Sequence, residues 1–558
     1  MALWQTIRSN SGLADDTAWR RLVVRWSAVS LLLIGLAAYF SYGFYQFDEH
    51  YQVVEFAGFK LGKTPESELA WEYRAEIRPW LQPGMYYVAA KGLTAIGVEN
   101  PFMLATAFRA ISGLFGWSAV VALMLSANVL FGAGRRRRLA VVLLATLWLI
   151  PYLAVRTSGE SLGGDFLAIG IAALLLGSTA DERQPSDVRN RRRFLPAAAL
   201  LAGICFGLAF EFRFQIAFAV LGVMGWMVYT SADSVRRRAV NIILLSLGVL
   251  AIVALGTLVD RWGYGRWTVV PWNYFHTDVV EGRPSLDGTD PPWAYVAKLI
   301  ATPVAPITLL WIVAMVVTWL RHPRHVVTWT TLPFFVVHSL VPHKELRYLF
   351  PLTLVATLAF VVGLAPGRDA LPHAAWLKAL WRQRRSGWAK ALVAVNVVGL
   401  LYACFVAREP SLNFQRFLFD RCPNGCRLYV LGDRTRSPFE NVGVTMYFYR
   451  PPNFTCRRLH SDEELAAIPR DGDDDVLIVR DRLADWSLPQ GTARLVYRTY
   501  PAWVEKYNIG NWLSNSKRFS VYAVESLPKT IGASTTSEQT IARAGGPQAP
   551  AANSNRTD

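Results

Sequence analysis

Long apolar runs, separated by short polar connections, occupy most of the chain up to residue 407. A helix needs about 20 apolar residues to cross the hydrocarbon core of a bilayer, and each run reaches or approaches that length. The pattern predicts an all-α polytopic membrane domain over 22–407, and the first run is long enough to stay in the membrane. The eleven expected spans are 22–43, 102–131, 139–155, 162–180, 194–210, 214–231, 239–258, 303–320, 327–341, 349–365 and 389–407.

Basic residues indicate the orientation of these spans. If residues 1–21 are cytoplasmic, nearly every dense basic cluster falls in a cytoplasmic connection, as the positive-inside rule requires. The large loop 44–101 and the region 408–527 then lie on the opposite, extracytoplasmic side. The cytoplasmic clusters are Arg135–Arg138, the Arg183 to Arg193 segment, Arg236–Arg238, Arg321 with Arg324, and the Arg368 to Lys390 segment.

Residues 408–527 have a different character. Short β-rich runs such as Leu428–Leu431 and Asp475–Val479 alternate with Gly, Pro and Asp, which predicts a small α/β extracytoplasmic domain. Its cysteines, Cys422, Cys426 and Cys456, allow a disulfide outside the cytosol. Residues 528–558 are rich in Ala, Ser, Thr, Gly and Pro and predict a disordered tail.

Composition agrees with a membrane protein. The chain is 53% hydrophobic and contains 21 Trp, which excludes an ordinary soluble globular protein of this size. The net charge of +17 by itself suggests nucleic acid as a partner. The basic residues, however, are grouped between apolar runs, as orientation signals are. We therefore expect the lipid bilayer, and not nucleic acid, as a partner.

An acidic pair, Asp48 and Glu49, follows the first span. The pair is explained equally well as a solvated span end, but carboxylates next to a membrane are costly and are often functional. Gln52 and Glu55 fall on the same helical face as Asp48 if the segment is helical. Adjacent residues point in different directions, so we expect Asp48 to face a cavity and to act as a base.

A cationic cluster, His343, Lys344 and Arg347, follows the predicted ninth span. Lys344 and Arg347 are three residues apart and therefore neighbours on a helix, where they can hold one anion. The alternative is a basic span end paired with Glu345. Because basic residues are sparse on the extracytoplasmic side, we favour an anionic ligand such as a phosphate.

Further polar breaks lie on the same side. Arg156 and Arg213 are in short connections that, taken singly, are most simply hairpin turns, and both are candidates for holding a phosphate or a carboxylate. Tyr264 and Asn273 lie in an aromatic segment. Aromatic faces with polar groups suit sugar rings, although an aromatic belt at the membrane interface explains the Trp residues there equally well.

Together these motifs are similar to those of one family. Over about residues 22–450 the chain resembles glycosyltransferase family twenty-two, the dolichyl-phosphate-mannose-dependent mannosyltransferases with the GT-C membrane fold. The Asp-Glu-x-x-Gln and His-Lys-Glu-x-Arg motifs are specific in combination, and Phe47 stands where members often have Pro. The segments concerned are Asp48 to Glu55, Trp71 to Arg78, Arg156 to Ser161, Arg213 to Gln215, Asp260 to Phe275 and His343 to Tyr348.

The resemblance implies inverting transfer of mannose from a polyprenyl-phosphate carrier to a hydroxyl of a glycan or glycolipid acceptor, without a metal or other cofactor. Asp48, with Glu49 beside it, would be the catalytic base. The Arg-rich composition favours a bacterial inner membrane with a periplasmic site, or the lumenal face of the endoplasmic reticulum in a eukaryote. The implied phosphate-binding residues are His343, Lys344, Arg347 and Arg156, and the implied substrate-binding residues are Gln52, Glu55, Arg213, Tyr264 and Asn273.

Two alternatives remain at this point. The enzyme could transfer another lipid-linked sugar, such as arabinose or glucose. A transporter or flippase also carries charges in its membrane domain, but it typically places them near the bilayer midplane, on broken helices from paired repeats. Here the charges lie at span ends on one side and no repeat is visible, so an enzyme is favoured.

Overall fold

The computed structural model describes residues 1–180, 191–302, 304–364, 387–409, 411–431 and, with short gaps, 439–526. The chain forms two compact units. The first contains Met1–Pro423 and Ser437–Pro451, and the second contains Asn424–Arg436 and Pro452–Asp558. The predicted domain boundary at residue 407 is therefore corrected, because 408–423 and 437–451 belong to the first unit. The predicted tail 528–558 lies outside the described residues.

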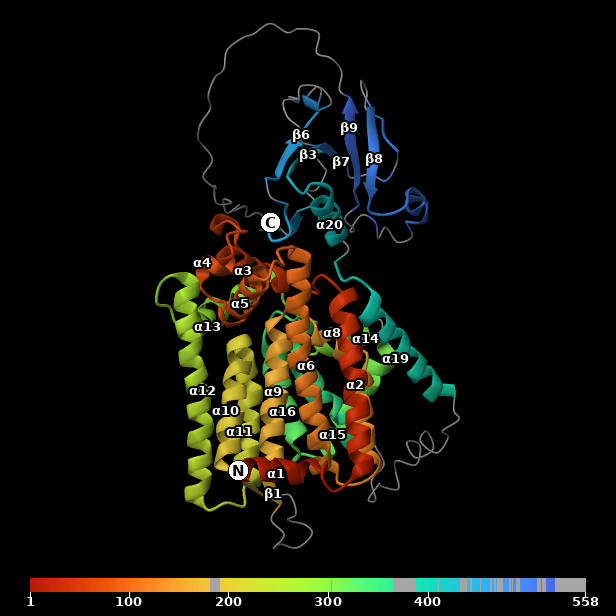
Figure 1. The fold of residues 1–558 in the computed structure, drawn as a ribbon. Coiled ribbons are helices and arrows are strands. Elements are labelled where there is room, and N and C mark those ends of the chain that lie inside the picture. Colours follow the sequence, from red (N-terminus) through yellow and green to blue (C-terminus); the bar gives the residue numbers. More distant parts are fainter. Residues whose placement is uncertain are drawn as a thin grey trace, which may run out of the picture. The chain divides into compact units, whose positions relative to one another are not determined.

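The first unit is a bundle of long helices (Figure 1). Every predicted span corresponds to a helix or to consecutive short helices, as the expected helical membrane fold requires. The elements are α2 (Thr17–Phe40), α6 (Pro101–Phe131), α7 (Arg135–Thr146), α8 (Leu149–Ala154), α9 (Gly159–Leu176), α10 (Pro196–Phe212), α11 (Ala217–Thr230), α12 (Val235–Tyr264), α15 (Ala305–Arg321), α16 (Val326–Leu340), η7 (Leu346–Leu352), α17 (Thr353–Thr357), η8 (Phe360–Leu364) and α19 (Gly387–Phe405).

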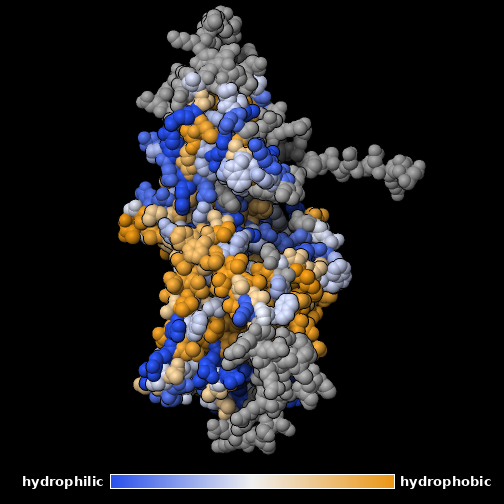
Figure 2. Space-filling model, turned by 90° about the vertical axis from the view of Figure 1, so that its right-hand side faces the viewer, coloured by the Kyte–Doolittle hydropathy of each residue, from blue (hydrophilic) through white to orange (hydrophobic). Residues whose placement is uncertain are grey.

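Five described helices, α2, α6, α9, α12 and α19, are each long and apolar enough to cross a membrane alone. α15 and α16 also pass this test as a pair, but they are bent by 112° at the break between them. Leu247, Leu250 and Leu258 of α12 are more than half exposed. Figure 2 shows hydrophobic side chains forming a broad band over the helices on one face, with hydrophilic ones gathered at their lower end. The bundle therefore presents a lipid-facing surface, and the number of crossings stays a prediction.

Small residues bring the helices of the bundle close together. A Cβ atom on Gly203 of α10 would lie 2.1 Å from the carbonyl oxygen of Leu245 in α12, and one on Gly222 of α11 would lie 1.9 Å from the carbonyl oxygen of Trp329 in α16. Close backbone approach through small residues is the usual packing mode of helices in a membrane, where lipid removes the hydrophobic driving force between them.

The loop after α2 folds into short helices at one end of the bundle, opposite to the N-terminal helix α1 (Ala2–Ser11) (Figure 1). Its backbone N–H at Trp80 donates to the Asp260 carboxylate, 2.7 Å away, near the end of α12. This contact anchors the loop to the bundle. The loop elements are η1 (Glu49–Val54), α3 (Glu55–Lys60), η2 (Glu66–Glu68), α4 (Trp71–Ala75) and α5 (Leu81–Ala95), and α13 (Val270–Phe275) lies beside them.

The second unit contains a five-stranded sheet in the order β6-β3-β7-β9-β8. β3 pairs in parallel with both β6 and β7, whereas β9 is antiparallel to β7 and β8. The predicted β-rich runs Leu428–Leu431 and Asp475–Val479 lie in β3 and β7, and the residues from Leu428 to Val430 are buried. The strands are β3 (Cys426–Leu431), β6 (Thr455–Leu459), β7 (Asp475–Arg480), β8 (Thr492–Arg498) and β9 (Ser520–Ser526).

Candidate active site

Asp48 and Glu49 lie where the chain enters η1, a π-helix whose six residues are all buried. They line a cavity with an empty volume of about 540 Å³ including its open mouth. π-Helical turns are rare and are frequently found at functional sites. The other residues of the cavity wall come from the loop after α2, from the start of α9, from the connection between α10 and α11, and from α13. They include Gln52, Arg78, Gln82, Ser158, Glu160, Arg213, Gln215 and Tyr274.

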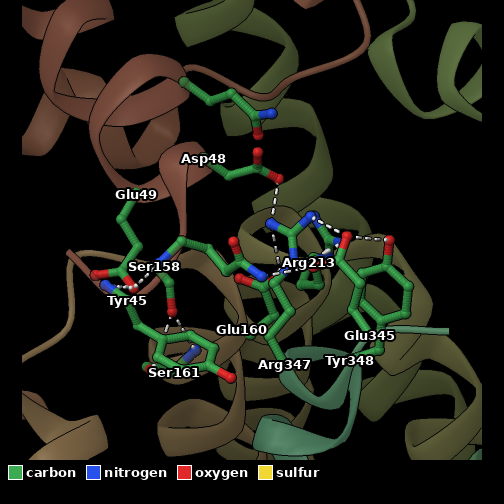
Figure 3. A network of polar contacts seen from close by, with 12 residues as sticks. Tyr45, Asp48, Glu49, Ser158, Glu160, Ser161, Arg213, Glu345, Arg347 and Tyr348 are labelled. Carbon is green, nitrogen blue, oxygen red and sulfur yellow. Dashed lines mark hydrogen bonds and ion pairs between the residues drawn. The ribbon is translucent and has the colours of Figure 1, made fainter. Parts of the chain in front are cut away.

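Arg347 meets Asp48 although 299 positions separate them in the sequence. Its Nη1 donates to Asp48 Oδ2, and its Nε and Nη2 donate to the two carboxylate oxygens of Glu345 at 2.8 Å and 3.0 Å (Figure 3). Glu160 Oε1 lies 3.8 Å from Nη1. One guanidinium group therefore joins three carboxylates, and it holds Asp48 at the wall of the cavity.

The pKa of Asp48 reflects this pairing. Burial of the carboxyl group raises its pKa, but the positive charges of Arg347 and Arg78 outweigh burial, and the pKa falls below its ordinary value. The side chain is 26% exposed. Asp48 is thus ionised near neutral pH and reachable from the cavity, as a base that receives a proton must be.

Glu49 has a different environment. Its Oε1 accepts hydrogen bonds from the backbone N–H groups of Tyr45 and Gln46, at 2.9 Å and 3.3 Å, whereas its buried Oε2 has no hydrogen-bond partner among the described residues. Burial raises the pKa of Glu49 to about 7, against the opposing charge of Arg156. The two adjacent carboxyl groups therefore have pKa values shifted in opposite directions, as pairs with different roles often do.

Two further cations face the cavity. Arg213 Nη2 lies 3.4 Å from Glu160 Oε1. Arg78 Nη2 lies 4.0 Å from Asp48 Oδ2 and 3.9 Å from Glu72 Oε1, and its buried Nε has no hydrogen-bond partner in the described part of the chain. The sequence predicts Arg213, but not Arg78, as a substrate-binding residue. The only signal for Arg78 is its place in the Trp71 to Arg78 segment that carries the family resemblance.

None of the four cations predicted to bind the phosphate is among the described residues that line this cavity, and Arg347 reaches it only through its contact with Asp48. Lys344 is buried and donates to the backbone carbonyls of Asp290 and Val341. Arg156 is also buried, and it donates to backbone carbonyls of Ser41, Gly43 and Tyr152. The imidazole of His343 contacts the carbonyl of Gly288 and the Glu345 carboxylate. Lys344 and Arg156 therefore direct their charged groups at backbone carbonyls and not into this cavity.

The residues predicted to bind substrate divide into two groups. Gln52 and Arg213 line the cavity. Tyr264 lies behind it and donates to the backbone carbonyl of Arg78 at 2.7 Å. Asn273 donates to Thr268 Oγ1 and to the carbonyl of Glu76. Tyr264 and Asn273 therefore shape the wall without reaching into the cavity.

Glu55, the remaining predicted substrate contact, is almost fully buried. Its carboxylate accepts hydrogen bonds from Thr64 Oγ1 and from the backbone N–H groups of Tyr447 and Phe448, and it pairs with His50 at 2.7 Å. The His50 ring is stacked between Phe44 and Tyr449. Glu55 therefore ties η1 and α3 to the chain at Tyr447 and Phe448 and does not face the cavity.

A second, apolar cavity runs among α8, α14 (Ala294–Ile300), α15, η7 and α19, with an empty volume of about 2260 Å³ including its open mouth. We call it the apolar groove. Leu346, Leu349 and Leu352 of the 3₁₀ helix η7 line it at intervals of three residues, and such residues are eclipsed on one face of a 3₁₀ helix. Arg347, on another side of η7, meets Asp48. This short helix thus contacts Asp48 at the polar cavity with one side and lines the apolar groove with another.

The bundle has a lipid-facing surface, a base at a polar cavity and an apolar groove lined by η7, as expected of a membrane-embedded enzyme that acts on an amphipathic substrate. The comparison with known proteins agrees. Residues 26–453 match the model of the Alg9-like mannosyltransferase family, and the chain belongs to this family. It is therefore an integral membrane enzyme of the mannosyltransferase kind, and the resemblance to glycosyltransferase family twenty-two is confirmed.

Individual relatives are distant. The chain is 21% identical over 389 residues to mannosyltransferase APTG1 of Arabidopsis thaliana, a match that covers 68% of the chain and 67% of that protein. It is 26% identical over 228 residues to GPI alpha-1,2-mannosyltransferase 3 of Danio rerio, covering 39% of each. Among solved structures, apo ArnT from Cupriavidus metallidurans is 15% identical with a TM-score of 0.49, covering 91% of this chain and 98% of that chain.

Proposed function

We propose that the protein transfers mannose from a polyprenyl-phosphate carrier to a hydroxyl group of a glycan or glycolipid acceptor, with inversion at the anomeric carbon. The observation that carries this proposal is the arrangement around η7. Arg347 of η7 contacts Asp48 at the polar cavity, whereas three leucines of the same helix line the apolar groove. We therefore place the sugar head of the carrier at the polar cavity and its isoprenoid chain in the groove.

In this proposal the acceptor hydroxyl enters the polar cavity, and Asp48 Oδ removes its proton as the oxygen attacks the anomeric carbon. The bond between that carbon and the phosphate oxygen breaks on the opposite face, and polyprenyl phosphate leaves. A positioned general base typically contributes about 10²–10⁴-fold to the rate. Arg347 keeps Asp48 ionised and oriented before the substrate arrives.

The remaining polar side chains of the cavity suit a sugar. Gln52, Gln82, Gln215 and Tyr274 offer amide and hydroxyl groups, and Arg213 and Arg78 offer several N–H donors. We propose that these residues contact the acceptor and the transferred sugar. Because the leaving phosphate is stabilised by protein cations, the transfer needs no metal ion or other cofactor.

The placement of the site in the cell follows from orientation. Basic connections favour the cytoplasmic side, so we propose an extracytoplasmic site. The membrane would be a bacterial inner membrane, with the site facing the periplasm. If the chain is eukaryotic, the corresponding site faces the lumen of the endoplasmic reticulum.

The test is transfer of radiolabelled mannose from polyprenyl-phosphate-mannose in membranes that contain the wild-type protein or Asp48→Asn, with identification of the labelled product. The expected product is an α-mannoside formed by the wild type, and at most about 1% of that amount with Asp48→Asn. Polyprenyl-phosphate-arabinose and polyprenyl-phosphate-glucose are tested in parallel. Transfer of one of these sugars instead of mannose would replace the proposed donor.

A further inference from the structure

The apolar groove contains one charged side chain. Among the described residues that line it, Arg408 alone carries a formal charge, and the others are mainly aliphatic and aromatic. A cation at the edge of a low-dielectric cavity attracts anions strongly, because little water screens it. Groove and cation together suit a molecule that is apolar along most of its length and anionic at one end.

The backbone fixes the position of Arg408. Its N–H donates to the carbonyl oxygen of Tyr42 at 2.7 Å. The next residue, Glu409, packs against Gly43, where a Cβ atom would lie 2.5 Å from the Glu409 nitrogen, and Gly43 has a φ of +94°. Only glycine fits both the close approach and this backbone conformation. The chain after α19 is thereby held against the segment that leads to Asp48.

Arg408 has donors to spare. Nη1 donates to the Tyr402 hydroxyl at 2.6 Å, and the guanidinium group lies 5.0 Å from the ring centre of Tyr45 and 5.8 Å from that of Tyr152. Within the described part of the chain no carboxylate is in ion-pair contact with it. Glu409, its neighbour, instead accepts a hydrogen bond from the Ser411 N–H. A guanidinium group has five N–H donors, so several are available to a ligand.

In contrast to Arg408, Arg347 has its charge already compensated by carboxylates. It already contacts the carboxylates of Asp48, Glu345 and Glu160. A phosphate that approached it would meet three negative charges around one positive charge. Binding there would require Arg347 to release a carboxylate and leave it in a partly buried site, which is costly. Of these two arginines, Arg408 is the one whose charge is not yet neutralised.

Tyr45 contacts both the apolar groove and Glu49, the neighbour of Asp48. Its ring lines the groove and contacts Phe350 of η7, while its backbone N–H donates to Glu49. Burial raises the pKa of Tyr45, and the positive charges of Arg408 and Arg347 both oppose this rise. Both cations are therefore near this tyrosine. A phosphate held by Arg408 would therefore lie beside Tyr45, whose backbone N–H donates to Glu49, the neighbour of Asp48.

We propose that Arg408 binds the phosphate of the polyprenyl carrier at the mouth of the apolar groove, a role that rests on the proposed transfer reaction. When the bond between sugar and phosphate breaks, the phosphodiester becomes a phosphomonoester and gains one negative charge, while the acceptor proton passes to Asp48. Arg408 therefore stabilises the leaving group more as the reaction proceeds, which is the requirement for lowering the barrier.

The test compares three ligands on the purified, full-length protein in detergent. Polyprenyl phosphate, the uncharged polyprenol of equal length and phosphatidic acid are titrated against the wild type, Arg408→Ala and Arg408→Lys. The matched control is Arg236→Ala, which removes one exposed arginine outside both cavities. Charged hydrogen bonds of this kind are worth about 10- to 100-fold in affinity.

The expected result is that the wild type binds polyprenyl phosphate about 10- to 100-fold more tightly than polyprenol and more tightly than phosphatidic acid. Arg408→Ala should lose this preference and keep its affinity for polyprenol, Arg408→Lys should keep part of it, and the control should keep all of it. If Arg408→Ala does not fold, Arg408→Gln is compared in the same way.

A phosphate preference that survives the loss of the Arg408 charge overturns the proposal, as does equal binding of phosphatidic acid and polyprenyl phosphate by the wild type. This outcome is independent of the proposed reaction, because no turnover is measured. A wild type that binds polyprenyl phosphate through Arg408 but does not transfer mannose would instead overturn the proposed donor sugar.

Discussion

Which of the two adjacent carboxyl groups is the base can be decided by the pH dependence of transfer. Asp48 has a pKa below its ordinary value of 3.8, whereas burial raises the pKa of Glu49 to about 7. A base acts only in its ionised form. If Asp48 is the base, kcat/KM should therefore be nearly constant between pH 5 and pH 8 as far as this group is concerned.

If Glu49 is the base instead, kcat/KM depends strongly on pH. If Glu49 were the base, about 1% of it would be ionised at pH 5, two units below its pKa, so kcat/KM would fall about 100-fold from its plateau above pH 7. The quantity kcat/KM is the appropriate one because it reports the free enzyme, the state in which Arg347 pairs with Asp48.

The assay is mannose transfer in detergent from pH 5 to pH 8, with the wild type, Asp48→Asn and Glu49→Gln. We expect a flat profile for the wild type, a loss of about 10²–10⁴-fold for Asp48→Asn at every pH, and a flat profile at a reduced level for Glu49→Gln. Circular dichroism and thermal unfolding of the variants serve as folding controls. An acid limb near pH 7 that disappears in Glu49→Gln would refute the assignment of Asp48.

Two further substitutions test the structural roles assigned above. Glu55→Gln should lower the free energy of unfolding by about 1.5–3 kcal/mol, because charged hydrogen bonds to buried partners are lost. Thermal unfolding in detergent measures this change. A Tm equal to that of the exposed control Glu99→Gln would contradict the prediction. Lys344→Ala should lower Tm and leave the KM for the donor within about twofold in the protein that folds, since its ammonium group serves backbone carbonyls. A tenfold higher KM with an unchanged Tm, relative to the exposed control Lys91→Ala, would restore the phosphate role that the sequence suggested for it.

The apolar pattern was sufficient to predict the helical membrane domain. Runs of about 20 apolar residues have few stable structures other than helices in a bilayer, so the segments could be located without tertiary information. The alternation of basic connections also placed Asp48 and Arg347 on one side, and the structure brings them into contact. A strongly one-sided charge pattern therefore carried long-range information.

Only the tertiary structure decided which charged residues face a cavity. Lys344 and Arg347 are equally basic and three positions apart, yet the irregular backbone between α16 and η7 turns Lys344 onto backbone carbonyls and Arg347 onto Asp48. No sequence motif marks Arg408, and Arg78 is marked only by the family-like segment that it ends. The cavity lined by Arg78 and the groove lined by Arg408 are each formed by segments far apart in the sequence. Hydropathy depends on composition over a window of residues, whereas a binding site depends on side-chain directions that packing alone sets.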